Sequence, residues 1–68
     1  MNTKMNRDEI ADELMRGCPD ESFDDHEAIA EAIRNGVELE DLLKMPELDR
    51  WPDTYSWVLS ELEKLGED

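Results

Sequence analysis

Apolar residues recur along the chain with the spacing of amphipathic helices. Between residues 6 and 17 they stand at positions 10, 11, 14 and 15, and a similar three- and four-residue spacing returns at 28–33 and 55–65. This spacing places apolar side chains on one stripe of a helix with 3.6 residues per turn. No segment alternates apolar and polar residues as a half-buried strand does. The pattern predicts an all-α fold, a compact small bundle of three main helices plus one short helix.

Capping residues predict where the first two helices begin. Asn6 stands three residues before Glu9, which is the spacing of a capping box, and a glycine ends this helix at position 17. Asp24 is the predicted N-cap of the second helix, with Glu27 at its third position. The Asn-Gly pair at 35–36 predicts the end of that helix.

The second half of the chain predicts a short helix, a connector and a long helix. Leucines at 39, 42 and 43 share one side of the short helix, which Pro46 ends. Residues 46–53 are rich in turn formers and predict a connector with one loose helical turn. Pro52 suits the first turn of the last helix, which we expect to reach Leu65.

Length and composition indicate one small domain. The 68 residues are expected to form a single acidic helical domain, 1–68, with frayed ends at about 1–5 and 66–68. A chain this short buries only about 60% of the surface that it exposes when unfolded, so we expect marginal stability. The first ten residues contain no apolar run typical of a signal peptide, and no segment approaches the roughly 18 apolar residues of a membrane span. A single cysteine fits a reducing compartment, and the expected location is cytoplasmic.

Charge narrows the choice of partner. Twenty acidic residues stand against seven lysines and arginines, which gives a net charge of −13. Nucleic-acid binding needs a basic footprint, and anionic membranes repel an acidic protein. We therefore expect no direct contact with nucleic acid or membrane, and a basic protein surface as partner. The alternative is that the acidity only keeps a small domain soluble.

The stretch PDESFDDHE at 19–27 concentrates this charge, with five acids and no lysine or arginine. A calcium loop beginning at Asp20 would use Asp24 and Glu31 at its fifth and twelfth positions. The sixth position of such a loop needs a glycine for its sharp turn, and Asp25 stands there instead. We expect no calcium site.

Other site chemistry is also disfavoured. Cys18 and His26 are the only cysteine and histidine in the chain, too few for a recognisable zinc ligand set. His26 is expected at the surface, in the first turn of the second helix. A domain with so little core can hardly desolvate its carboxylates enough to tune them for acid–base chemistry. We expect no metal, no cofactor and no enzyme activity.

The expected binding surface joins acids of the first two helices to two aromatic side chains. Acids four residues apart on a helix are separated by about 6 Å along its axis, which is comparable with the spacing of phosphates along a nucleic-acid strand. Trp57 points away from the apolar stripe of the last helix, so we expect it at a partner interface. The alternatives are a groove against the 46–52 connector and a homodimer interface. The expected contact residues are Asp12, Glu13, Asp20, Glu21, Phe23, Asp24, Asp25, Glu27, Glu31 and Trp57.

Residues 32–45, AIRNGVELEDLLKM, resemble the DNA-binding helix-turn-helix. The resemblance implies similar helix packing. DNA binding is not carried over, because the second helix of the motif would carry acids where a groove-reading helix needs donors, and Pro46 cuts it short. The matching positions are Ala32, Gly36, Val37 and Leu42.

In size and composition the chain resembles the small acidic inhibitors of phages and other mobile elements. Some of these, among the anti-CRISPR and anti-restriction proteins, mimic DNA. The resemblance implies a non-enzymatic protein that binds a host nucleic-acid-handling protein or complex and blocks its basic groove. Two alternatives stay open: a small adaptor or regulatory protein that binds through an apolar helix surface, and an antitoxin-like protein that neutralises a basic toxin. Salt separates mimicry from an apolar contact, because ions screen attraction between exposed charges.

Overall fold

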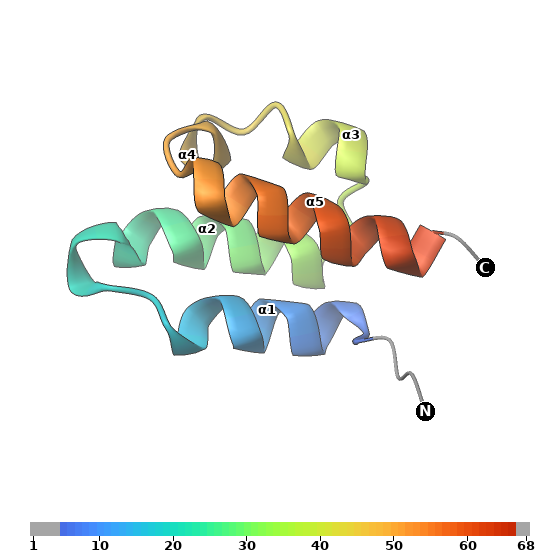
Figure 1. Ribbon diagram of the computed structural model, residues 1–68, viewed down its shortest axis with the longest axis horizontal. Coiled ribbons are helices and arrows are strands. Elements are labelled where there is room, and N and C mark those ends of the chain that lie inside the picture. The colour runs from blue at the N-terminus through green and yellow to red at the C-terminus, as the bar shows by residue number, and fades with distance from the viewer. Residues whose placement is uncertain (1–4, 67–68) are drawn as a thin grey trace.

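The computed structural model describes residues 5–66, and all regular secondary structure in this range is helical. Three long helices form the bundle, and two single-turn helices join the second long helix to the last (Figure 1). The predicted all-α fold with three main helices is confirmed, and α4 is a second short helix beside the predicted one. The elements are α1 (Arg7–Arg16), the 3-10 turn η1 (Asp20–Ser22), α2 (Phe23–Arg34), α3 (Leu39–Leu42), α4 (Pro46–Asp49) and α5 (Pro52–Gly66).

The first and last described residues belong to the fold. Met5 packs against the core, and Gly66 is the last residue of α5. The predicted capping box opens α1: the Glu9 backbone N–H donates to Asn6 Oδ1 (2.9 Å), and the Asn6 backbone N–H donates to Glu9 Oε1 (3.0 Å). Loss of such a cap typically costs about 1 kcal/mol. The other residues expected to fray, 1–4 and 67–68, lie outside the described residues.

The prediction of Asp24 as the N-cap of the second helix is wrong. Ser22 occupies that position and makes no side-chain cap, while Asp24 lies in the first turn of α2. The cause is Pro19, whose fixed φ starts η1, and the Ser22 backbone N–H donates to the Pro19 carbonyl oxygen (3.1 Å). Helical backbone therefore begins before Asp24, and this carboxylate lies near the positive end of the helix dipole without capping it.

The predicted end of α2 at the Asn-Gly pair is confirmed as a Schellman motif. Gly36 has φ +83°, its N–H donates to the Ile33 carbonyl (3.2 Å), and the Val37 N–H donates to the Ala32 carbonyl (3.2 Å). Arg7 then reaches across from α1, and its Nη1 donates to the carbonyls of Ile33 (3.0 Å) and Val37 (2.9 Å). One guanidinium thus satisfies helix-end carbonyls and joins the start of α1 to the end of α2.

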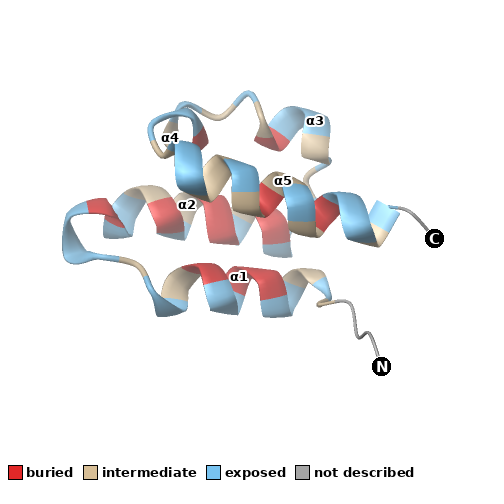
Figure 2. Cartoon of the chain, viewed as in Figure 1, coloured by how far each residue is buried: buried red, intermediate tan, exposed pale blue. Residues whose placement is uncertain are grey.

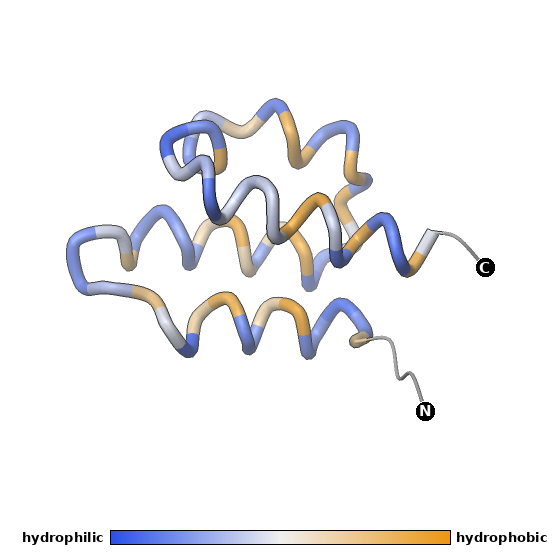
Figure 3. Tube along the Cα trace, viewed as in Figure 1, coloured by the Kyte–Doolittle hydropathy of each residue, from blue (hydrophilic) through white to orange (hydrophobic). Residues whose placement is uncertain are grey.

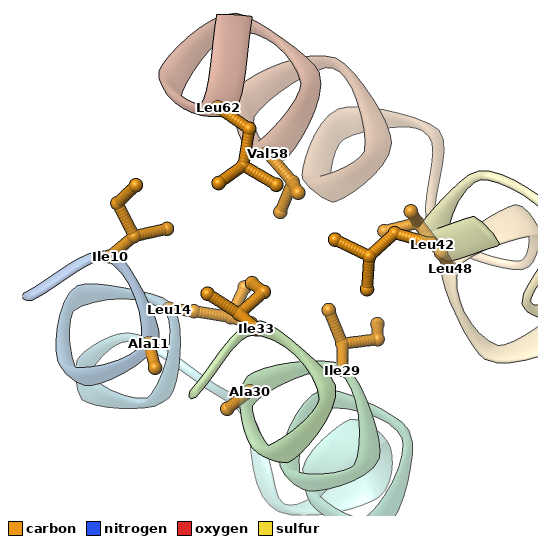
Figure 4. Close-up of a cluster of buried hydrophobic side chains, with 10 residues drawn as sticks. All are labelled: Ile10, Ala11, Leu14, Ile29, Ala30, Ile33, Leu42, Leu48, Val58 and Leu62. Atoms are coloured by element: carbon orange, nitrogen blue, oxygen red, sulfur yellow. The ribbon is translucent and has the colours of Figure 1, made fainter. Parts of the chain in front are cut away.

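All five helices contribute to a single core (Figure 4). The buried positions of the long helices face inward, and the same turns carry hydrophilic residues on their outer side (Figures 2 and 3). This arrangement is what the helical spacing of apolar residues predicts. The core residues are Ile10, Ala11, Leu14, Ile29, Ala30, Ile33, Leu42, Leu48, Val58 and Leu62.

The connector between the short and last helices is part of the core. Pro46 opens α4, and Leu48 in the middle of that turn has no exposed surface. Leu42 of α3 is equally buried and points into the same core (Figure 4). The two short helices therefore close one side of the bundle, which the three long helices alone leave open.

The resemblance to a helix-turn-helix stops at the turn. Gly36 supplies the left-handed turn residue, but α3 has only four residues. Glu40 and Asp41 of this short helix are exposed. A helix of one turn carrying exposed carboxylates cannot lie in a DNA groove as a recognition helix does.

Candidate partner-binding surface

Three helix ends meet at one end of the molecule, on the left in Figure 1: the end of α1 and the starts of α2 and α5, with α4 beside them. Two side-chain contacts fix this arrangement, Asp25 to Arg50 and His26 to Thr54. The result is that acids from separate parts of the sequence gather here. We call the exposed members of this group the acidic end; they are Asp20, Glu21, Asp24, Asp49 and Asp53.

His26 is buried, so its predicted surface position is wrong. Only 6% of its surface is exposed, and its Nδ1 lies 3.0 Å from the Ser22 carbonyl oxygen. Because a carbonyl only accepts, Nδ1 carries a proton there, and Nε2 lies within hydrogen-bond distance of the Thr54 hydroxyl oxygen (3.1 Å). Trp51 covers the ring, with centroids 5.9 Å apart. His26 thereby holds the start of α5 against α2.

Asp25 is half-buried and already engaged by its own chain, which makes it a poor contact for a partner. Its Oδ2 accepts from the Trp51 indole N–H (2.9 Å), and its Oδ1 accepts from Arg50 Nη1 (3.0 Å). The Trp51 hydrogen bond, and then Arg50, hold the pKa of the Asp25 carboxyl below its ordinary value, although burial opposes them. Asp25 therefore has a structural role, and its expected contact with a partner stays a prediction.

This lowered pKa predicts how Asp25 stabilises the fold at different pH values. The unfolded carboxyl binds a proton near pH 3.9, and the folded one only at lower pH, so the stabilisation is complete above about pH 4 and is lost as pH falls through the folded pKa. We expect Asp25→Asn to be less stable than the wild type at pH 7, and the difference to shrink below about pH 4. Urea unfolding of both proteins across this range measures it.

The Trp51→Phe variant is the control for this pH dependence, because it removes the strongest donor and keeps the carboxylate. Its stability relative to the wild type is expected to recover at low pH in the same way. A deficit of Asp25→Asn that is as large at about pH 2.5 as at about pH 7, on either side of the ordinary carboxyl pKa, contradicts the role assigned to Asp25.

The other expected acids are exposed, and two of them have partners on the protein itself. Asp12 forms an ion pair with Arg34 of α2, and Glu13 lies 3.6 Å from Arg16. Among the described residues, Asp20, Glu21, Asp24, Glu27 and Glu31 form no ion pair. This last set, named here the acidic row, begins in η1 and continues along one face of α2.

The two aromatic side chains expected at the surface differ in exposure. Phe23 at the start of α2 is 45% exposed and is the one large apolar residue exposed in the described chain. Trp57 is half-buried and packs against the core, so its expected position opposite the apolar stripe is wrong. The reason is that the end of α1 packs beside α5, where Glu13, Leu14 and Gly17 line the same pocket as Trp57. Trp57 still reaches the surface at a pocket.

The pocket has a volume of ≈ 300 Å³ and lies where α1, α2 and α5 meet. It brings together two residues that the sequence predicts as contacts, Glu13 and Trp57, which are 44 positions apart. Asp53 and Thr54, at the start of α5, also line the pocket. The remaining lining residues are Leu14, Gly17 and His26. Sequence reasoning missed Asp53 and Thr54. The sequence places both residues directly after Pro52, in the first turn of the last helix. Polar residues are usual at such positions, so this placement does not indicate a binding site.

The described residues carry no sign of a metal site or a membrane span. No group of three or more histidine, cysteine, aspartate or glutamate side chains in residues 5–66 is arranged to hold a metal ion. Most of the would-be calcium loop, from Asp24 to Glu31, is part of α2. None of the helices in the described range is long and apolar enough to cross a membrane.

Comparison with known proteins gives no family assignment: no family model, no curated protein and no solved structure matches the chain. Function is therefore argued from the acidic row, the acidic end and the pocket.

Proposed function

We propose that this protein is a non-enzymatic inhibitor, of the anti-CRISPR or anti-restriction kind, that binds a basic surface of a host nucleic-acid-handling protein. It blocks access of nucleic acid to that surface by charge mimicry. The observation that carries the proposal is the acidic row, five exposed carboxylates that form no ion pair with another described residue. Throughout the described chain, every acid except Asp25, Glu47 and Glu61 is exposed.

The spacing of the row supports mimicry of a phosphate backbone. Asp24, Glu27 and Glu31 are separated by three and four residues in α2, so they lie on one face at intervals of about 4.5 and about 6 Å along the axis. Asp20 and Glu21 extend this line into η1. Like charges at these spacings repel one another, and no ion pair within residues 5–66 offsets that repulsion. A basic groove that normally holds nucleic acid would compensate them on binding.

The competing proposal of an adaptor that binds through an apolar surface has less support. Contacts of that kind need an apolar patch of several residues, and Phe23 is the one large apolar side chain exposed in the described chain. We assign Phe23 to the inhibitor surface as an apolar contact next to the acids. An antitoxin-like protein would use the same acidic row against a basic toxin. The two functions differ in the partner that the protein binds, a toxin in one case and a nucleic-acid-binding protein in the other.

The proposal is tested by immobilising the protein, exposing it to a nuclease-treated bacterial lysate at low salt, and eluting with duplex DNA. We expect DNA to displace a nucleic-acid-binding protein, because the two compete for one basic surface. An antitoxin would retain a protein that binds no nucleic acid and that DNA does not displace. Capture of no protein that DNA displaces contradicts the proposal.

A further inference from the structure

We propose that the pocket between α1 and α5 receives an arginine side chain of the basic partner. The inference rests on the proposed function, since it names the side chain that anchors the partner to the acidic surface. The pocket borders the acidic end, with which it shares Asp53, and it is also lined by the aromatic residue Trp57.

The pocket combines an apolar base with acidic edges. Leu14 and His26 are 7% and 6% exposed, and Trp57 packs against the core beside them. Glu13 of α1 and Asp53 of α5 are both exposed lining residues, and they come from different helices. A side chain that enters therefore passes carboxylates at the mouth and meets an aromatic surface at the base.

Trp57 is held in place by its packing against the core. No hydrogen bond to its indole N–H is present among the described residues, whereas the Trp51 N–H donates to Asp25. Because Trp57 is already packed, binding costs little side-chain ordering.

A cation fits this lining better than an anion or a neutral group. Two carboxylates repel anions, and an indole face attracts a cation through its quadrupole. The one cation paired with either carboxylate among the described residues is Arg16, and that pair is weak because Glu13 lies 3.6 Å away and 77% of the Arg16 side chain is exposed. Arg16 can yield to a better-placed cation at small cost.

Arginine is favoured over lysine by the chemistry of the lining residues. A planar guanidinium can stack on the Trp57 ring and donate two parallel hydrogen bonds to one carboxylate, and it is more weakly hydrated than an ammonium group. Basic surfaces that hold nucleic acid are rich in arginine for the same reason, because guanidinium pairs with phosphate. The pocket and the acidic row therefore favour the same class of partner, a protein with an arginine-rich surface that binds nucleic acid.

The test is a titration of the ¹⁵N-labelled protein with acetyl-arginine amide, followed through its two indole N–H signals by NMR. We expect the Trp57 signal to shift in a saturable way, while the Trp51 signal, already hydrogen-bonded to Asp25, stays in place as an internal control. Acetyl-citrulline amide has the same shape without the charge and is expected to leave both signals unchanged. Equal shifts by the two compounds, or no shift of Trp57 at saturating arginine amide, contradict the proposal.

Two double variants separate the pocket from the overall charge. Glu13→Gln with Asp53→Asn removes both pocket carboxylates, and we expect it to weaken arginine-amide binding about threefold or more, the size of two weak surface ion pairs. Glu40→Gln with Asp41→Asn on α3 changes the net charge equally and is expected to leave binding unchanged. The unmoved Trp51 signal shows that each variant is folded.

The pocket and the proposed function fail in different ways. If Trp57→Leu binds the DNA-displaced partner as tightly as the wild type, the pocket proposal is wrong and charge mimicry stands. If arginine amide binds at Trp57 but the lysate yields no protein that DNA displaces, the pocket stands and the proposed function is wrong.

Discussion

Leu48→Ala is expected to lower the free energy of unfolding by about 2–5 kcal/mol, the usual cost of truncating a fully buried leucine. A domain of this length has a total stability of roughly 3–10 kcal/mol, at about 0.05–0.15 kcal/mol per residue. The variant is therefore expected to lose a large share of the total stability and to unfold at a lower temperature than the wild type. Urea unfolding followed by far-UV circular dichroism, with sucrose added to keep the variant folded at zero urea, measures the difference.

Leu65→Ala is the matched control for this prediction, since it removes the same atoms from a half-buried position near the end of α5. We expect it to cost less than half as much as Leu48→Ala. An equal or smaller loss at Leu48 would show that α4 does not pack into the core.

Reversing three charges of the acidic row, with Asp20→Lys, Glu21→Lys and Asp24→Lys, is expected to weaken binding of the DNA-displaced partner at least about tenfold. Each exposed ion pair contributes about 0.5 kcal/mol, so three lost attractions already amount to one power of ten in the dissociation constant. New repulsion between the lysines and the basic surface increases the loss. Isothermal titration calorimetry at low salt measures it.

The control carries the same three reversals on and beside α3, Glu38→Lys, Glu40→Lys and Asp41→Lys, all at exposed positions. It has the same net charge as the first variant, and we expect it to retain most of the affinity. Equal weakening by both variants would mean that total charge alone drives binding, and the acidic row would then not be the contact surface.

The fold was predictable where local chemistry decides it. The Asn6 capping box and the left-handed Gly36 depend on residues within one turn, and both are present as predicted. Leu48 was not predictable as a core residue, because a lone leucine between turn formers has no periodicity to reveal its burial. Its role depends on how α3 and α4 fold back over the bundle, which is tertiary information.

The candidate site was predictable in part for the same reason. The exposed acids of the row follow from composition and helical phase, and the structure leaves them at the surface. His26 and Asp25 differ, because their partners Thr54 and Trp51 lie more than 25 positions away in the sequence. The burial of these two polar side chains depends on hydrogen bonds to residues far away in the sequence, and no local sequence pattern predicts those partners.

The central claim, that the acidic surface takes the place of nucleic acid, is tested most directly by equilibrium competition between duplex DNA and this protein for the captured partner. At low salt we expect each ligand to displace the other completely, and the affinity of the protein for the partner to fall steeply as salt is raised from about 50 to about 500 mM. A ternary complex that contains both ligands, with an affinity for this protein that salt leaves unchanged, would contradict the claim.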